Sequence, residues 1–318
     1  MHEPASALYA FCRLADDAVD AAGSRRDAVE RLRERLRLAY AGTPKDESAD
    51  RALALVVAQH RIPAALFDAL LEGFEWDLQG RRYDTLEDVH DYAARVAGTV
   101  GAMMALLMGV RCADGLARAC DLGVAMQLSN IARDVGEDAR MGRLYLPRDW
   151  MQQAGLDPDA WLARPVFSPE LGGVVQRVLD AAEVLYARVD AGVARLPLAC
   201  RPGINAARFM YAAIGHEVAR RGLDSVSTRA RVSGARKAWL LLRAVAKFAP
   251  SAAASDVPPL AATRFLVDAA LAAAPRADAS ARRGLAARVV WTAELFARLE
   301  ERDRLRRAAF ASGRDLAT

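Results

Sequence analysis

The sequence predicts an all-α protein, and three observations point to this class. Apolar residues recur at helical spacing along most of the chain, and no alternating strand pattern occurs. Glycine and proline mark the boundaries between the periodic segments. Hydrophobic residues make up 53% of the 318 residues, which is enough for a large common core. We therefore expect a single helical bundle around an apolar interior.

The first half of the chain divides into five expected helices. The first covers about 4–22 and ends at Gly23. An Arg/Glu-rich helix follows, with Ser24 and Asp27 resembling a capping box, and ends before residue 42. The third covers 63–79. The fourth starts at Thr85–Asp88 and includes the VAGTVG run, and the fifth covers about 115–138.

The second half begins with a loop, expected at 140–149. Proline and glycine then delimit three helices. The first starts at Ser168-Pro169 and ends before residue 197, the second runs from Pro202 to residue 222, and the third runs from Ser233 to about residue 248. Residues 250–259, rich in Pro, Ser and Ala, suggest a linker. The Ala/Arg-rich remainder should be a C-terminal helical extension, so we expect a bundle over 1–250 and a linker with an extension over 251–318.

Two acidic stripes are the main chemical feature. Asp16 lies one helical turn before Asp20, and Asn130, Asp134 and Asp138 follow one another at the same spacing, so each set shares a helix face. Both stripes lie among apolar residues, where each close carboxylate pair costs roughly 4 kcal/mol at an effective dielectric near 20. Hard oxygen ligands favour Mg²⁺. A solvated acidic turn is an equally good interpretation of one stripe, but two stripes together favour a metal site.

Other residues near the stripes have two interpretations. Arg13 and Arg133 accompany the acidic residues and could bind phosphate through bidentate contacts. Gln127 and Asn130 could be ligands or ordinary interhelical hydrogen bonders. The glycine-rich run at 96–110 indicates close helix packing or a channel for a long apolar substrate.

Aromatic residues also have a functional and a structural interpretation. The rings of Tyr9 and Tyr211 could stabilise a carbocation. For Phe11 core packing is the better interpretation.

Composition excludes several function classes. The net charge is +4, and the excess of arginine over lysine reflects codon usage better than nucleic-acid binding. No HExxH or CxxC pair occurs, so a zinc protease or a paired-cysteine metal site is not indicated. The four cysteines (Cys12, Cys112, Cys120 and Cys200) are expected to be small core residues in a reducing compartment. No secretory signal and no apolar run of about 20 residues is present, so any membrane contact should be peripheral.

Three blocks of sequence closely resemble the squalene/phytoene synthase family, in particular its bacterial phytoene synthases. They read YAFCRLADDAVD, FEWDLQGRRYDTLEDVHDYAARVAGTVG and ACDLGVAMQLSNIARDVGEDARMGRLYLPRDW, with a weaker match in RFMYAAIGHEVARRGLDSVSTRARVSGARKA. The resemblance spans residue 3 to about 248. It implies an isoprenoid-synthase-type bundle with a central cavity, which condenses two geranylgeranyl diphosphates to 15-cis-phytoene in carotenoid biosynthesis.

The resemblance also implies roles for individual residues. Mg²⁺, with Mn²⁺ as an alternative ion, would be bound by Asp16, Asp17, Asp20, Asn130, Asp134 and Asp138. Among these, Asp16, Asp20, Asp134 and Asp138 would be catalytic. The substrate would contact Tyr9, Arg13, Gln127, Asn130, Arg133 and Tyr211, together with Arg229 and Arg231, between which the loose register does not decide.

Two departures from the family pattern stand out. Asp16 is close to the first residue, and we expect a preceding Ser-Phe segment to be missing from a truncated N-terminus. Some relatives have a tyrosine where this chain has Ala94, so that role is not carried over.

The resemblance also bears on partners. It implies a cytoplasmic protein with no nucleic-acid partner and no expected NADPH, and it leaves open peripheral contact with the inner membrane surface and weak association with other carotenoid enzymes. One alternative is dehydrosqualene or squalene synthesis from farnesyl diphosphate. The other is a non-catalytic helical scaffold.

Overall fold

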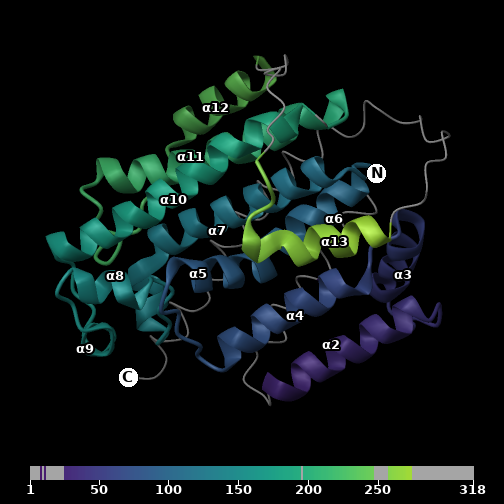
Figure 1. Ribbon diagram of the computed structural model, residues 1–318, viewed down its shortest axis with the longest axis horizontal. Coiled ribbons are helices and arrows are strands. Elements are labelled where there is room, and N and C mark those ends of the chain that lie inside the picture. Colours follow the sequence, from purple (N-terminus) through teal and green to yellow (C-terminus); the bar gives the residue numbers. More distant parts are fainter. Residues whose placement is uncertain (1–7, 9–10, 12–24, 195, 247–256, 274–318) are drawn as a thin grey trace.

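The computed structural model describes residues 8, 11, 25–194, 196–246 and 257–273, and every regular element in these ranges is helical (Figure 1). The long helix α7 (Ala113–Arg140) lies at the centre and contacts α10, α6, η1, α11, α13 and α5. Its buried residues, among them Leu116, Val124, Leu128 and Ile131, belong to the main hydrophobic core. The prediction of an all-α bundle is confirmed.

The first described elements form one side of the bundle. Helix α2 (Arg25–Tyr40) packs on α3 (Ser48–His60) and on α4 (Ala64–Leu78). The predicted helix at 63–79 is confirmed to within one residue at each end. Helix α3 was not anticipated, and the helix expected at 4–22 lies outside the described residues, except for Leu8 and Phe11.

The next predicted helix is interrupted by a change of helical pitch. Thr85 caps α5 (Leu86–Ala93) in a reciprocal capping box with Asp88, as the sequence predicts. The chain then passes through a π-helical segment, η1 (Ala94–Gly98), into α6 (Thr99–Leu107). Such π segments are rare and often lie at functional sites.

Glycines let α7 approach this interrupted helix closely. A Cβ at Gly123 would lie 2.3 Å from the Ala97 carbonyl oxygen, and one at Gly101 would lie 2.2 Å from that of Ala119. No side chain fits at either position, so the backbones of η1, α6 and α7 are in direct contact. The sequence interpretation of close packing is confirmed here.

The second half surrounds the other side of α7. It comprises α8 (Arg148–Gln153), α9 (Pro158–Ala163), α10 (Pro169–Val193), the short 3₁₀ segment η2 (Leu198–Cys200), α11 (Arg201–Arg220) and α12 (Gly234–Ala246). Ser168 caps α10 as expected, and α8 and α9 were not anticipated. Cys120 and Cys200 are buried, but Cys112 is exposed at the start of α7, which corrects its assignment to the core.

Residues 257–273 return to the bundle and pack on its outer side. After η3 (Ala261–Thr263), α13 (Arg264–Ala272) packs on α7, α4 and α6 and buries Leu266 and Val267 (Figure 1). The guanidinium of buried Arg118 donates to the Val257 and Pro258 carbonyls at 3.1 and 3.3 Å. The predicted division near residue 250 stays a prediction, since residues 247–256 are outside the described ranges.

None of the described helices is long and apolar enough to cross a membrane.

Candidate functional site

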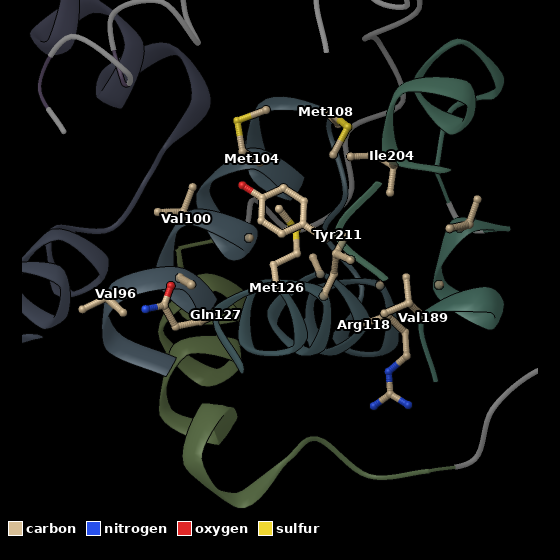
Figure 2. A pocket seen from close by; sticks show the side chains of 18 of the residues that line it. Val96, Val100, Met104, Met108, Arg118, Met126, Gln127, Val189, Ile204 and Tyr211 are labelled. Carbon is tan, nitrogen blue, oxygen red and sulfur yellow. The ribbon is translucent and has the colours of Figure 1, made fainter. Parts of the chain in front are cut away.

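A cavity of about 310 Å³ lies between α4, η1, α6, α7, α10 and α11 (Figure 2). Its wall is mainly apolar, with lining residues that include Leu70, Phe74, Val100, Met104, Met108, Met126, Val189 and Ile204. Gly101 and Gly123 also line it, so the same glycines that allow close helix packing leave open space beside them. Close packing is therefore confirmed at these glycines, and their role in a channel for a long apolar substrate stays a prediction.

Tyr211 and Arg118 face this cavity in different ways. The Tyr211 side chain extends from α11 into the middle of the lining residues, whereas the Arg118 guanidinium points away from them (Figure 2). Arg118 instead pairs with buried Asp121, whose Oδ2 lies 3.1 Å from Nε. The aliphatic part of Arg118 thus lines the cavity, while its guanidinium forms an ion pair with Asp121 outside it.

The cavity has one polar end, formed by Gln127 and Asn130 of α7. Asn130 lies one turn before Asp134 on the same helix face. Its Oδ1 is buried and has no hydrogen-bond partner among the described residues. A buried carbonyl oxygen without a donor is costly, so this atom is suited to a bound cation or a donor group on a ligand.

Asp134 lies between two arginines just beyond this polar end. Arg133 donates from Nε to Oδ1 at 2.7 Å and from Nη2 to Oδ2 at 2.5 Å. Arg229 donates from Nε to Oδ1 at 2.7 Å and from Nη2 to Oδ2 at 3.3 Å. Its Nε also lies 3.6 Å from Glu137 Oε2. Two guanidinium groups in this arrangement are a suitable binding site for a diphosphate.

The position of Arg229 depends on a close contact between its loop and α7. The Gly136 amide donates to the Ser225 carbonyl at 3.0 Å. A Cβ at Gly136 would lie 2.2 Å from the Val226 carbonyl oxygen, so only glycine permits this approach. Arg140 Nη1 donates to the same Val226 oxygen at 3.3 Å. The loop after α11 is therefore fixed against the acidic end of α7.

Asp138 lies one turn further along α7. Burial raises its pKa well above the usual range, and the neighbouring Asp134 carboxylate raises it further, while Arg143 opposes the shift. A carboxyl in this environment is stabilised as the anion only by added positive charge. This is the environment expected for a cation ligand.

A polar aromatic cluster adjoins Asp138. Asp77 of α4 accepts hydrogen bonds from the Tyr145 hydroxyl at 2.7 Å and the Tyr92 hydroxyl at 3.0 Å. The rings of Tyr92 and Tyr145 stack with centroids 4.9 Å apart. Burial raises the pKa of Asp77. All three residues lie in sequence blocks that resemble the family, but no role could be predicted for them, because single Asp and Tyr residues are common in helices.

The described residues fit one half of a magnesium site. Asn130, Asp134 and Asp138 offer hard oxygen atoms along a single helix face, the donor type that Mg²⁺ prefers. No group of three or more His, Cys, Asp or Glu residues that could hold a metal occurs among the residues described. The other predicted ligands, Asp16, Asp17 and Asp20, lie outside those residues, as do Tyr9 and Arg13.

The structure thus brings together most of the predicted residues that it describes. Gln127, Asn130 and Tyr211 line the cavity. Arg133, Asp134 and Arg229 form one ion-paired group. Of the two arginines left open by the sequence, Arg231 is exposed and Arg229 contacts Asp134.

The ring of Phe11 meets Phe67 edge-on at 5.4 Å within the core. This agrees with the packing interpretation of Phe11.

Comparison with known proteins gives a consistent result. The family model described as squalene/phytoene synthase matches residues 1–236. A phytoene synthase from Cereibacter sphaeroides is 54% identical over 288 residues, which cover 86% of this chain and 81% of the relative. A 15-cis-phytoene synthase from a Paracoccus species is 47% identical over 243 residues, covering 74% of this chain and 79% of the relative.

Solved structures show the same likeness at lower identity. A dehydrosqualene synthase in complex with ligand superposes with a TM-score of 0.68 at 31% identity, covering 76% of this chain and 84% of that one. A squalene synthase, HpnC from Alicyclobacillus acidocaldarius, superposes with a TM-score of 0.64 at 28% identity, covering 68% of this chain and 82% of that one.

Proposed function

Because this chain belongs to the squalene/phytoene synthase family, we propose that it condenses two molecules of geranylgeranyl diphosphate head to head to give 15-cis-phytoene, the first committed step of carotenoid biosynthesis. The chain is a prenyltransferase. The identity of 54% to a phytoene synthase over most of both chains supports the substrate choice, since the squalene and dehydrosqualene synthases among the solved structures are only about half as similar.

One structural observation carries the proposal: the apolar cavity has its polar end beside the Asp134–Arg229 pair. A prenyl diphosphate has the same polarity, with an anionic head on a long apolar chain. Its chain would occupy the space lined by Met104, Met126 and Val100. Its diphosphate would lie beyond Asn130, beside the Arg133 and Arg229 guanidiniums that Asp134 holds.

Arg133 and Arg229 would act on the leaving group. As the first diphosphate departs, negative charge accumulates on its oxygens, and guanidinium groups already in position stabilise that charge with little reorganisation. Asp134 holds both guanidiniums in place through paired hydrogen bonds. When bound, Mg²⁺ supplies the additional positive charge that neutralises the diphosphate.

The cavity wall would protect the allylic cation formed in this step. Water must be excluded, because it would capture the cation before the double bond of the second substrate attacks. The side chains of Val96, Val100 and Leu122 present no polar atoms to this space. The Tyr211 ring, which projects into the cavity, can stabilise positive charge through its face.

The second half of the metal site would come from the N-terminal segment. We assign Asp16, Asp17 and Asp20 to Mg²⁺ opposite Asn130, Asp134 and Asp138, with Arg13 and Tyr9 beside them. Mn²⁺ would substitute for Mg²⁺, because it accepts the same oxygen ligands.

The reaction product tests the proposal directly. The protein is incubated with geranylgeranyl or farnesyl diphosphate and Mg²⁺, with and without NADPH, and the hydrocarbon is identified by mass spectrometry. We expect phytoene from geranylgeranyl diphosphate, independent of NADPH. An exclusively thirty-carbon product would instead establish dehydrosqualene or squalene synthesis, and no product would favour the scaffold.

Three further assignments complete the proposal. The protein would act in the cytoplasm, with peripheral contact with the cytoplasmic face of the membrane and weak association with other carotenoid enzymes. No nucleic-acid partner is proposed.

A further inference from the structure

Helix α12 exposes an apolar face to solvent. Leu242, Val245 and Trp239 are 71%, 61% and 55% exposed, and Leu241 is 38% exposed. With Ala238 these residues form the outward face of α12, an arc of about 160° at 100° per residue. Single apolar residues on a protein surface are common, whereas a contiguous exposed apolar face of this kind often marks an interaction site.

The opposite face of α12 packs against α11. Leu240 and Ala244 are buried in a separate hydrophobic cluster with Phe209, Met210 and Ala213 of α11. Helix α12 thus lies on the outside of α11, with its outward face turned away from the bundle (Figure 1). A helix that is apolar on both faces is normally buried or in contact with lipid.

Basic residues border the outward face on both sides. Arg236 and Arg243 lie along one border and Lys237 along the other, and the helix contains no acidic residue. The Arg243 guanidinium lies 5.6 Å from the Trp239 ring centroid and 4.7 Å from that of Phe209, which holds it at the border. An apolar face flanked by cations and carrying Trp and Leu is the pattern of helices that lie in the headgroup region of anionic membranes.

We propose that the outward face of α12 binds the surface of an anionic phospholipid bilayer. The choice of lipid as partner rests on the proposed function, because an enzyme with an isoprenoid substrate and a hydrocarbon product exchanges both with a membrane. Charge argues against a second copy of the chain on this face, since a twofold contact would bring the three basic residues of each α12 together. The helix that anchors α12 also carries Tyr211 and Ile204 of the cavity wall, so membrane contact lies one helix away from the substrate site.

Vesicle binding tests this surface. The full chain is sedimented with vesicles of phosphatidylcholine alone or mixed with phosphatidylglycerol, without substrate. We expect binding to the anionic vesicles that weakens as NaCl is raised from about 50 to 500 mM. The double variant Leu242→Glu/Val245→Glu should bind at least about tenfold more weakly, because two apolar side chains that would enter the bilayer are lost and two charges repelled by anionic lipid are added.

A matched control tests whether added negative charge elsewhere on the protein also weakens vesicle binding. The double variant Val166→Glu/Val184→Glu introduces the same two negative charges at valines that are 58% and 63% exposed, and should bind as the wild type does. Turnover of detergent-dispersed substrate should be unchanged in both variants, so a failure of the proposed function is seen separately from a failure of membrane binding.

Three results would overturn the proposal. The first is equal vesicle binding by the double variant and the wild type, or no binding by either. The second is a wild-type dimer that the double variant dissociates, which would make the face a subunit interface. The third is a large fall in melting temperature for the double variant, which would mean that the face is covered within the chain.

Discussion

Arg229 and Asp134 are 95 residues apart in the sequence, and the guanidinium of one donates to both carboxylate oxygens of the other. The contact joins the loop after α11 to the acidic face of α7. It favours Arg229 over Arg231 as the arginine that would bind diphosphate, because Arg231 is exposed on the same loop.

Replacing Arg229 should therefore reduce catalysis far more than replacing Arg231. We expect Arg229→Met to lower kcat/KM by about 100- to 1,000-fold, the usual effect of removing one group that stabilises charge on a leaving oxygen. Arg231→Met should stay within a few-fold of the wild type. Steady-state kinetics with geranylgeranyl diphosphate give both values, and the reverse order would move the assignment to Arg231.

Asp134 should be needed for metal-dependent diphosphate binding. Asp134→Asn keeps the shape of the side chain but removes the charge shared by Arg133 and Arg229. Since even indirect contacts to metal ligands are worth about 10- to 100-fold, the loss in kcat/KM should be at least about 100-fold. Calorimetric titration of a non-reactive diphosphate analogue, with and without Mg²⁺, should show that the Mg²⁺-dependent gain in affinity is lost. Retention of that gain would show that Asp134 is not a metal ligand.

Gly123 should be required for the approach of α7 to η1. Gly123→Ala places a methyl group 2.3 Å from the Ala97 carbonyl oxygen, so the helices must separate, at a cost of about 1–3 kcal/mol in unfolding free energy. Urea unfolding followed by circular dichroism measures this loss. Gly173→Ala is the matched control, because Gly173 is exposed in α10 with no atom within 4 Å, and it should gain about 0.5–1 kcal/mol. Equal effects at the two positions would contradict the close contact.

The stability should depend on pH through Glu217. Hydrogen bonds from Arg220 and then Arg221 lower the pKa of this carboxyl to about 2. A depressed pKa stabilises the fold above the unfolded value near 4.5, and this contribution is lost as the pH falls from there toward 2. The melting temperature of Glu217→Gln should thus lie below that of the wild type at pH 7, and the difference should shrink at pH 3. A difference that is constant with pH, or that Glu30→Gln on α2 reproduces, would exclude this linkage.

The sequence predicted local features of this fold well. Thr85 and Ser168 begin α5 and α10 as expected, because a cap depends only on neighbouring residues. The acidic face of α7 was predicted from the spacing of Asn130, Asp134 and Asp138, since one long regular helix fixes which residues share a side.

Features that depend on distant parts of the chain were missed. The π-helical turn at Ala94–Gly98 has no local signal in the sequence, and it lies where Gly123 of α7 approaches the Ala97 carbonyl closely. The hydrogen bonds from Tyr92 and Tyr145 to Asp77 join residues 15 and 68 positions apart, and no pattern in the sequence links them. Arg118, which pairs with buried Asp121, donates to the carbonyls of residues 257–258 before α13, and no local pattern links these distant positions.

That ion pair gives the last prediction. Asp121 is fully buried between Arg118 and Arg188, with Oδ2 3.1 Å from the Nε atom of each, and both arginines donate to carbonyls at 257–258. Asp121→Asn would remove the charge of the buried carboxylate that both guanidiniums contact, and breaking a buried ion pair typically costs about 3–5 kcal/mol. The variant should unfold at lower urea, and protease should cleave near residue 257 sooner, because that segment is held by the same arginines. Asp180→Asn, an exposed change on α10, should alter neither measurement. Faster cleavage without a loss of global stability would mean that Asp121 only holds the segment before α13 in place. No change in either measurement would contradict the prediction.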